Sequence, residues 1–281
     1  MQPNEKKQLE CMACKIRIHA VDAVHAAKSG HPGGSLSIAD LLSCLYFYKM
    51  RVDPKNPKWE DRDRLVLSKG HCAPGLYAAL ALKGYFPVEE LKKLRKPGAM
   101  LQGHPDMKGT PGIDMSTGSL GQGFSTACGM AAAAKADHKD YRVYSIIGDG
   151  ETQEGQIWEA AMFASNYCLD NLCAIVDCNG LQIDGNVAYS NSADSLAEKF
   201  ASFGFEVITI DAHDYDQILS ALDQAEATQG KPTVIIAKSI KGKGVSFMEN
   251  NVAWHGSAPN DEQYAQAMDE LNAQLKSLEV E

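Results

Sequence analysis

The chain has 281 residues, 44% of them hydrophobic, and a formal net charge of −9 at pH 7, which suits one sizeable folded core and disfavours binding to nucleic acid. No apolar run reaches the roughly 18 residues that a membrane span needs, and the polar segment Met1–Lys7 lacks the apolar stretch of a secretion signal. We therefore expect a cytoplasmic protein, not bound to membranes, whose eight cysteines are reduced.

The first half of the chain is expected to be mostly helical. Apolar residues recur at intervals of three and four across residues 5–28, which predicts an amphipathic helix. The segment Ser29–Gly34 is expected to break this helix. The later elements of this half are predicted as a helix at 37–50, a strand at 64–68, a helix at 74–83 and a long structured loop at 84–117.

From residue 121 onward, predicted helices and strands alternate. Helices are expected at 121–136, 156–167, 193–203 and 215–228, and strands at 142–147, 172–177, 206–210 and 232–237. This alternation predicts an α/β fold, a parallel sheet with helices on both faces. The sequence shows no repeat and no linker, so we expect one domain over residues 1–281.

The tail, from about residue 260 to 281, is predicted to be an acidic helix. Its apolar residues fall on one stripe, formed by Tyr264, Met268, Leu271, Leu275 and Leu278. Such a stripe is typical of a docking face, either on the same domain or on a partner.

The most informative motif is Gly148-Asp149-Gly150, which is followed thirty residues after Asp149 by Asn179. Both segments come at the ends of predicted strands, and ligands of open parallel sheets bind at these carboxyl ends. Asp149 offers a carboxylate oxygen, Asn179 an amide oxygen and Leu181 a backbone carbonyl. Three oxygens leave about half of an octahedral shell open, which suits Mg²⁺ (or Ca²⁺ or Mn²⁺) shared with phosphate oxygens.

This spacing resembles the shared motif of thiamin diphosphate enzymes, which begins with Gly-Asp-Gly and closes with Asn about thirty residues later. Further segments resemble those of the transketolase family in particular, and they occur in the family's order from about residue 8 to 260. They are Ser29-Gly-His-Pro-Gly-Gly34, Ser68-Lys-Gly-His71, Gly103-His-Pro105, Ser116-Thr-Gly-Ser-Leu-Gly-Gln-Gly123, Gln153-Glu-Gly155, Leu181-Gln-Ile-Asp-Gly185 and Trp254-His-Gly256.

The resemblance implies a thiamin diphosphate-binding fold and a role for each matching residue. The histidines expected to act on substrate are His31, His104 and His255. The residues expected to bind the cofactor are His71, Gly118, Ser119, Leu120, Gly150, Glu151, Asn179 and His255. The metal would be held by Asp149, Asn179 and Leu181, and the acidic residues expected at a subunit contact are Glu154 and Glu159. Ser119 departs from the proline and Glu151 from the small residue that are usual in the family.

Full-length transketolases carry a second domain that this chain lacks, so the resemblance implies a C-terminal partner subunit in an α2β2 assembly. The expected reaction is transfer of a two-carbon ketol group from a ketose phosphate of the xylulose 5-phosphate type to an aldose phosphate. One alternative is a modified donor, such as a sulfonated or branched sugar. A fragment of a 1-deoxyxylulose-5-phosphate synthase is disfavoured by the segments around His31 and His104, and a regulatory homologue that binds cofactor without turnover is disfavoured by the intact set of metal ligands and histidines.

Overall fold

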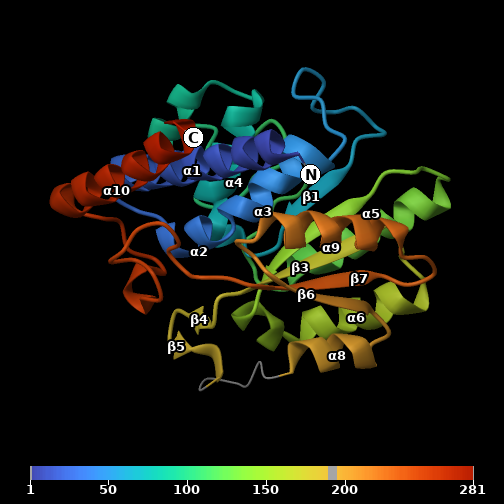
Figure 1. Ribbon diagram of the computed structural model, residues 1–281. Coiled ribbons are helices and arrows are strands. Elements are labelled where there is room, and N and C mark those ends of the chain that lie inside the picture. The colour runs from blue at the N-terminus through green and yellow to red at the C-terminus, as the bar shows by residue number, and fades with distance from the viewer. Residues whose placement is uncertain (1, 189–194, 281) are drawn as a thin grey trace.

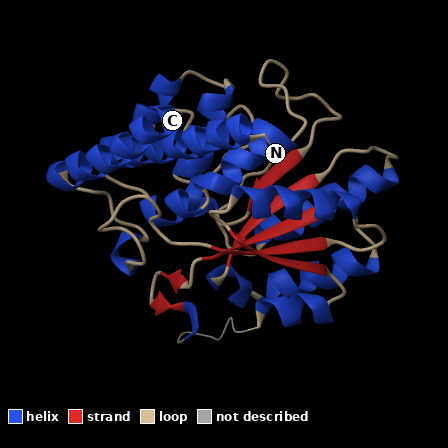
Figure 2. Ribbon diagram, viewed as in Figure 1, coloured by secondary structure: helices blue, strands red, loops and turns tan. Residues whose placement is uncertain are grey.

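The computed structural model describes residues 2–188 and 195–280. Its centre is one five-stranded parallel sheet in the order β1-β2-β3-β7-β6. The strands are Arg64–Leu67 (β1), Val143–Gly148 (β2), Leu172–Cys178 (β3), Glu206–Asp211 (β6) and Thr233–Lys238 (β7). Helices cover the sheet on both sides, as Figures 1 and 2 show, which confirms the predicted α/β architecture.

Successive side chains of the strands point to opposite faces, so the sheet separates two hydrophobic cores. On β2, Val143 and Ile147 belong to one core, while Tyr144 and Ile146 belong to the other. The first core is closed by α5 (Gln122–Ala136), α6 (Gly155–Asn166) and α8 (Leu196–Ser202). The second is closed by α1 (Pro3–Ala27), α3 (Ala39–Cys44), α4 (Ala73–Lys83) and α9 (Tyr215–Ala227).

The predicted break after the first helix is confirmed, since α1 ends at Ala27, but the next helix starts earlier than residue 37, because α2 (Pro32–Ser37) begins at Pro32 and includes both Gly33 and Gly34. A β-carbon on Gly34 would lie 2.5 Å from the Cys72 sulfur. The glycines therefore permit close packing here and do not end the helix. After α3, a single π-helical turn (Leu45–Lys49) completes the segment predicted as one helix.

The other departures from the predicted elements are small. Short 3₁₀ turns lie at Gly70–Cys72, Val88–Lys93, Gly150–Gln153 and Val252–Trp254. A two-stranded hairpin of β4 (Leu181–Gln182) and β5 (Gly185–Asn186) was not predicted, because two residues are too few for a recognisable pattern. The start expected for the 193–203 helix lies outside the described residues, and α8 is described from Leu196.

Helix α10 (Asp261–Val280) packs antiparallel along α1, so the start of α10 lies beside the end of α1, where His25 contacts Asp261 at 2.8 Å (Figure 1). Leu271 is fully buried in a cluster that includes Val21 of α1, and the Tyr264 hydroxyl donates a hydrogen bond to Asp22 at 2.9 Å. The apolar stripe of the tail therefore docks on its own domain. No helix among the described residues has the length and apolar character to cross a bilayer.

Candidate functional site

A cavity of about 390 Å³ opens where β2 and β3 end. Its wall includes most of the residues singled out from the sequence, namely His31, His71, Gly118, Leu120, Asp149, Gly150, Glu151, Glu154, Asn179, Leu181 and His255. Ser119, His104 and Glu159 are not among its lining residues, and all three are exposed. The structure thus brings most of the predicted residues to one cavity and leaves three of them outside its wall.

Four histidines from four distant segments gather at this cavity. The ring centroid of His31 lies 5.2 Å from that of His71, 5.6 Å from that of His255 and 6.5 Å from that of His104. His104 thus joins the cluster from outside the cavity wall. His25 does not belong to this cluster and stacks on Tyr264, with the ring centroids 3.9 Å apart.

The environment keeps the clustered imidazoles neutral at pH 7. Burial, assisted by the charge of Arg95, lowers the pKa of His31 to about 4. Burial and the neighbouring Lys241 ammonium lower the pKa of His255 to about 3. The pKa values of His71 and His104 are lowered as well, in both cases chiefly by burial. Neutral imidazoles can both donate and accept hydrogen bonds, which suits contact with hydroxyl and carbonyl oxygens.

Lys241 is a functional candidate that the sequence did not single out. It is only 2% exposed, and its ammonium donates hydrogen bonds to the Leu181 carbonyl at 2.9 Å and to Nδ1 of His255 at 3.0 Å. A neutral His255 that accepts at Nδ1 carries its proton on Nε2. Burial, followed by repulsion from Lys69, lowers the pKa of Lys241. The cavity thus has a cation at its base beside the histidine cluster.

The three expected metal ligands lie on the same cavity. The Asp149 carboxylate accepts hydrogen bonds from the backbone amides of Gly150 at 2.8 Å and Gly180 at 2.6 Å. The Asn179 amide oxygen accepts one from the Leu181 amide at 3.1 Å. Burial and the nearby Asp177 charge raise the pKa of Asp149 to about 6. A cation bound beside Asp149 would stabilise the ionised form of this carboxylate.

The oxygen donors at the cavity fit a hard cation. Within residues 2–188 and 195–280 no group of three or more His, Cys, Asp or Glu side chains could hold a metal. A metal here must therefore use amide and carbonyl oxygens beside the single carboxylate of Asp149, which is the chemistry that Mg²⁺ accepts. The buried Nδ1 of His31 has no hydrogen-bond partner, so this nitrogen is available to hydrogen-bond a ligand.

Glu151 was expected to bind the cofactor, but its side chain instead hydrogen-bonds other segments of the chain. Its carboxylate accepts hydrogen bonds from the Ser68 hydroxyl at 2.5 Å, the Gly121 amide at 2.8 Å and the Gly148 amide at 2.9 Å. Three segments that form the cavity are thereby tied to one buried residue. The contacts with Ser68 and Gly121 link residues far apart in the sequence, so no local pattern could have revealed them.

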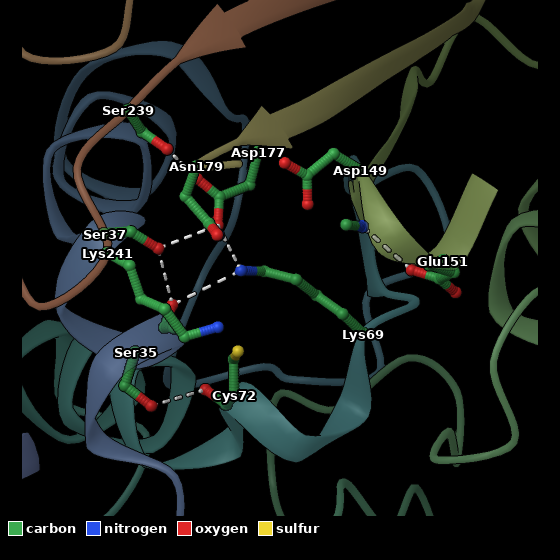
Figure 3. Close-up of polar contacts among 12 residues, drawn as sticks. Ser35, Ser37, Lys69, Cys72, Asp149, Glu151, Asp177, Asn179, Ser239 and Lys241 are labelled. Carbon is green, nitrogen blue, oxygen red and sulfur yellow. Dashed lines mark hydrogen bonds and ion pairs between the residues drawn. The ribbon is translucent and has the colours of Figure 1, made fainter. Parts of the chain in front are cut away.

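Asp177 and Lys69 form a buried ion pair next to Asn179, one of the expected metal ligands (Figure 3). The sequence interpretation assigned neither residue a role. One available signal was a lysine in the mostly apolar stretch Leu65–Cys72, because an unpaired buried lysine is rare.

Helix α6 presents an exposed face beside the cavity. Glu154 and Glu159 are exposed, and the apolar side chains of Met162 (55% exposed), Phe163 (39%) and Tyr167 (57%) follow them. Large apolar side chains that lie together on a surface indicate an interaction site.

Comparison with known proteins agrees with this geometry. The family "Transketolase, thiamine diphosphate binding domain" matches residues 9–280. The 6-deoxy-6-sulfo-D-fructose transketolase subunit of a Clostridium species is 52% identical over 94% of this chain and 96% of its own. An apulose-4-phosphate transketolase subunit of Phocaeicola vulgatus is 43% identical over 97% of both chains.

A solved structure supports the same assignment. Transketolase from Campylobacter jejuni superposes with a TM-score of 0.88 at 36% identity, and the match covers 96% of this chain but 45% of that one. This chain thus corresponds to less than half of that enzyme. The chain belongs to the transketolase family and is the thiamin diphosphate-binding part of a transketolase-type transferase.

Proposed function

We propose that this chain is the diphosphate-binding subunit of a two-chain transketolase, which transfers a two-carbon ketol group from a ketose to an aldose. The convergence of His31, His71, His104 and His255 beside Asp149 and Asn179 carries the proposal. Asp149, Asn179 and the Leu181 carbonyl would hold Mg²⁺ (or Ca²⁺ or Mn²⁺). His71, Gly150 and Lys241 would then bind the diphosphate.

Thiamin diphosphate, when bound, supplies the carbon nucleophile that this reaction needs. The chain itself would bind and orient the cofactor and the sugar. The neutral imidazoles of His31 and His104 would hydrogen-bond the hydroxyl and carbonyl oxygens of the sugar, and Nε2–H of His255 would donate to an oxygen that gains negative charge. His31, His71 and His255 are partly buried, which limits the access of water and strengthens their contacts.

A partner subunit follows from the exposed face of α6. Glu154 lines the cavity and is exposed, so the cavity is open on that side. A second chain that covers Glu154, Glu159 and Phe163 would close the site and bury the apolar surface. Both subunits named above as relatives are chains of similar length, since the matches cover 96% and 97% of them. We expect an α2β2 assembly located in the cytoplasm.

Two classes of ketose are candidates for the donor sugar. The first is a ketose phosphate of the xylulose 5-phosphate type. The second is a modified ketose, sulfonated or branched, and it is favoured by the names of the two relatives, which refer to a sulfofructose and to apulose 4-phosphate.

The decisive experiment measures ketol transfer with Mg²⁺ and thiamin diphosphate, using this chain alone and mixed with the product of a neighbouring reading frame. Xylulose 5-phosphate and 6-deoxy-6-sulfofructose are each offered as donor, with ribose 5-phosphate as acceptor. Activity only in the mixture supports the two-chain enzyme, and the preferred donor identifies the candidate. Activity of the isolated chain would contradict the need for a partner, and tight cofactor binding without turnover on either donor would favour the regulatory homologue.

A further inference from the structure

Asp177, at the end of β3, is a buried hub that links four side chains. It is 0% exposed, and its carboxylate accepts hydrogen bonds from Ser37 Oγ at 2.7 Å, Asn179 Nδ2 at 2.8 Å, Ser239 Oγ and Lys69 Nζ. Figure 3 shows these groups converging from different segments, with Asp149 nearby. Asp177 is not a lining residue of the cavity, so it acts on the site only through its neighbours.

Lys69 is held inside the protein. It is 2% exposed, and its ammonium donates hydrogen bonds to Asp177 and to the Gly34 carbonyl at 3.3 Å. Two of the three ammonium protons are thus used within the protein. Lys69 therefore balances the charge of Asp177 and holds it in place, and it also lines the cavity.

Stability does not explain such a pair. Burying two charges costs several kcal/mol per ion, and apolar residues of similar volume often stabilise a protein as well or better. A buried pair of this kind is expected to have a geometric task. The task here is visible at Asn179, which lines the cavity, contacts Asp177 directly and has an amide that can point either way.

The amide of Asn179 has two unlike ends, and only its oxygen can bind a cation such as Mg²⁺. An ionised carboxylate only accepts hydrogen bonds. Asp177 therefore takes the NH₂ end of Asn179, and the oxygen is left on the other side of the amide, where it contacts the Leu181 amide at 3.1 Å. Reversing the amide would place its oxygen against the Asp177 carboxylate.

We propose that Asp177 and Lys69 are the positioning residues of the metal site, Asp177 by fixing the Asn179 amide with its oxygen toward the ligand and Lys69 by holding the Asp177 carboxylate in that position. This inference rests on the proposed function, because it requires a metal held by Asp149, Asn179 and Leu181. Outer partners of this kind typically change metal affinity by roughly 10- to 100-fold when removed.

The test measures binding of Mn²⁺, as a paramagnetic substitute for Mg²⁺, by loss of the free-ion electron paramagnetic resonance signal. Thiamin diphosphate is present, and the full chain is used alone and with its partner subunit. The variants are Asp177→Asn and Lys69→Met. We expect both to weaken Mn²⁺ binding by roughly 10- to 100-fold. The Ser239→Ala variant is the matched control, because it removes a hydrogen bond to the same carboxylate without involving Asn179, and we expect little change in its Mn²⁺ affinity.

The two variants separate positioning from simple charge. Asp177→Asn removes a negative charge and Lys69→Met removes a positive one, so long-range attraction alone would weaken binding in the first and tighten it in the second. Tighter or unchanged Mn²⁺ binding by Lys69→Met, with the circular dichroism of the parent, overturns the inference. It does so even if Asp177→Asn fails to fold. If the parent chain binds no Mn²⁺, either alone or with its partner subunit, the proposed metal site is overturned, and this inference with it.

Discussion

The imidazole rings of His71 and His255 stack with their centroids 5.0 Å apart and an interplanar angle of 26°. Lys241 contacts Nδ1 of His255 and, after burial, is the main reason why the pKa of His255 is lowered to about 3. The Lys241→Met variant should therefore raise the pKa of His255, while burial keeps it below its ordinary value. Titration of the imidazole by nuclear magnetic resonance measures this, and Lys238→Met, which removes an exposed lysine at the end of β7, is the control. An unchanged pKa would contradict the role given to Lys241.

Asp149→Ala should abolish metal-dependent binding of thiamin diphosphate, because Asp149 is the only carboxylate in the proposed ligand set. Isothermal titration with and without Mg²⁺ measures this. Asp184→Asn is the matched control, since Asp184 lines the same cavity but is exposed. If Asp149→Ala binds as tightly as the parent, the metal lies elsewhere.

His104→Ala should leave cofactor affinity unchanged and lower kcat by roughly 100-fold, because His104 lies outside the cavity wall but 6.5 Å from His31. Steady-state kinetics with the partner chain and a cofactor titration check the two halves of the prediction. His138→Ala changes an exposed histidine in a turn and should alter neither quantity. Loss of cofactor binding in His104→Ala would mean that His104 belongs to the cofactor site.

Asp40→Asn should destabilise the fold by about 3–5 kcal/mol at pH 7, because it leaves Arg17 buried without its charge partner. Burial favours a higher pKa for Asp40, but Arg17 and His213 hold this pKa well below its ordinary range. Since the folded pKa lies below the unfolded value of about 3.9, the stabilisation is complete above that pH and is lost as the pH falls toward the folded pKa. Urea unfolding at pH 7 and at pH 3 should show a smaller difference between variant and parent at pH 3.

Met162→Asp should prevent assembly with the partner subunit, because it puts a charge into the exposed apolar face of α6. Sedimentation of the mixed chains measures assembly. Tyr48→Asp is the control, since Tyr48 is 48% exposed but lies on the π-helical turn after α3 and away from the cavity lining. Assembly of Met162→Asp with parent affinity would mean that the partner binds a different surface.

Much of the fold and the centre of the site could be predicted from sequence because they depend on local patterns. The strands of the sheet are runs of apolar residues, and the Gly-Asp-Gly segment and Asn179 both come directly after such runs. Parallel strands bring these ends together, so two motifs far apart in the chain indicated one site. The four histidines were found because each lies in a segment that resembles a family motif.

What could not be predicted are relationships between distant side chains. The contact of Lys69 with Asp177 joins positions 108 apart, and that of Ser68 with Glu151 joins positions 83 apart. Nothing near either residue in the sequence indicates its partner. The start of α2 was missed for a related reason, because Gly33 and Gly34 usually interrupt helices and are needed here only because Trp254 and Cys72 pack against them.

The pairing of β2 with β3 places Gly148 opposite Asp177, so Asp149 and Asn179 each follow a fixed rung of one hydrogen-bonded ladder. The sheet thus sets the distance between Asp149 and Asn179, the two side chains of the proposed metal site. Insertion of one residue into β3 would displace Asn179 along the strand by about 3.3 Å. Sequence changes elsewhere around the cavity that preserve the pairing of β2 with β3 would leave this distance unchanged.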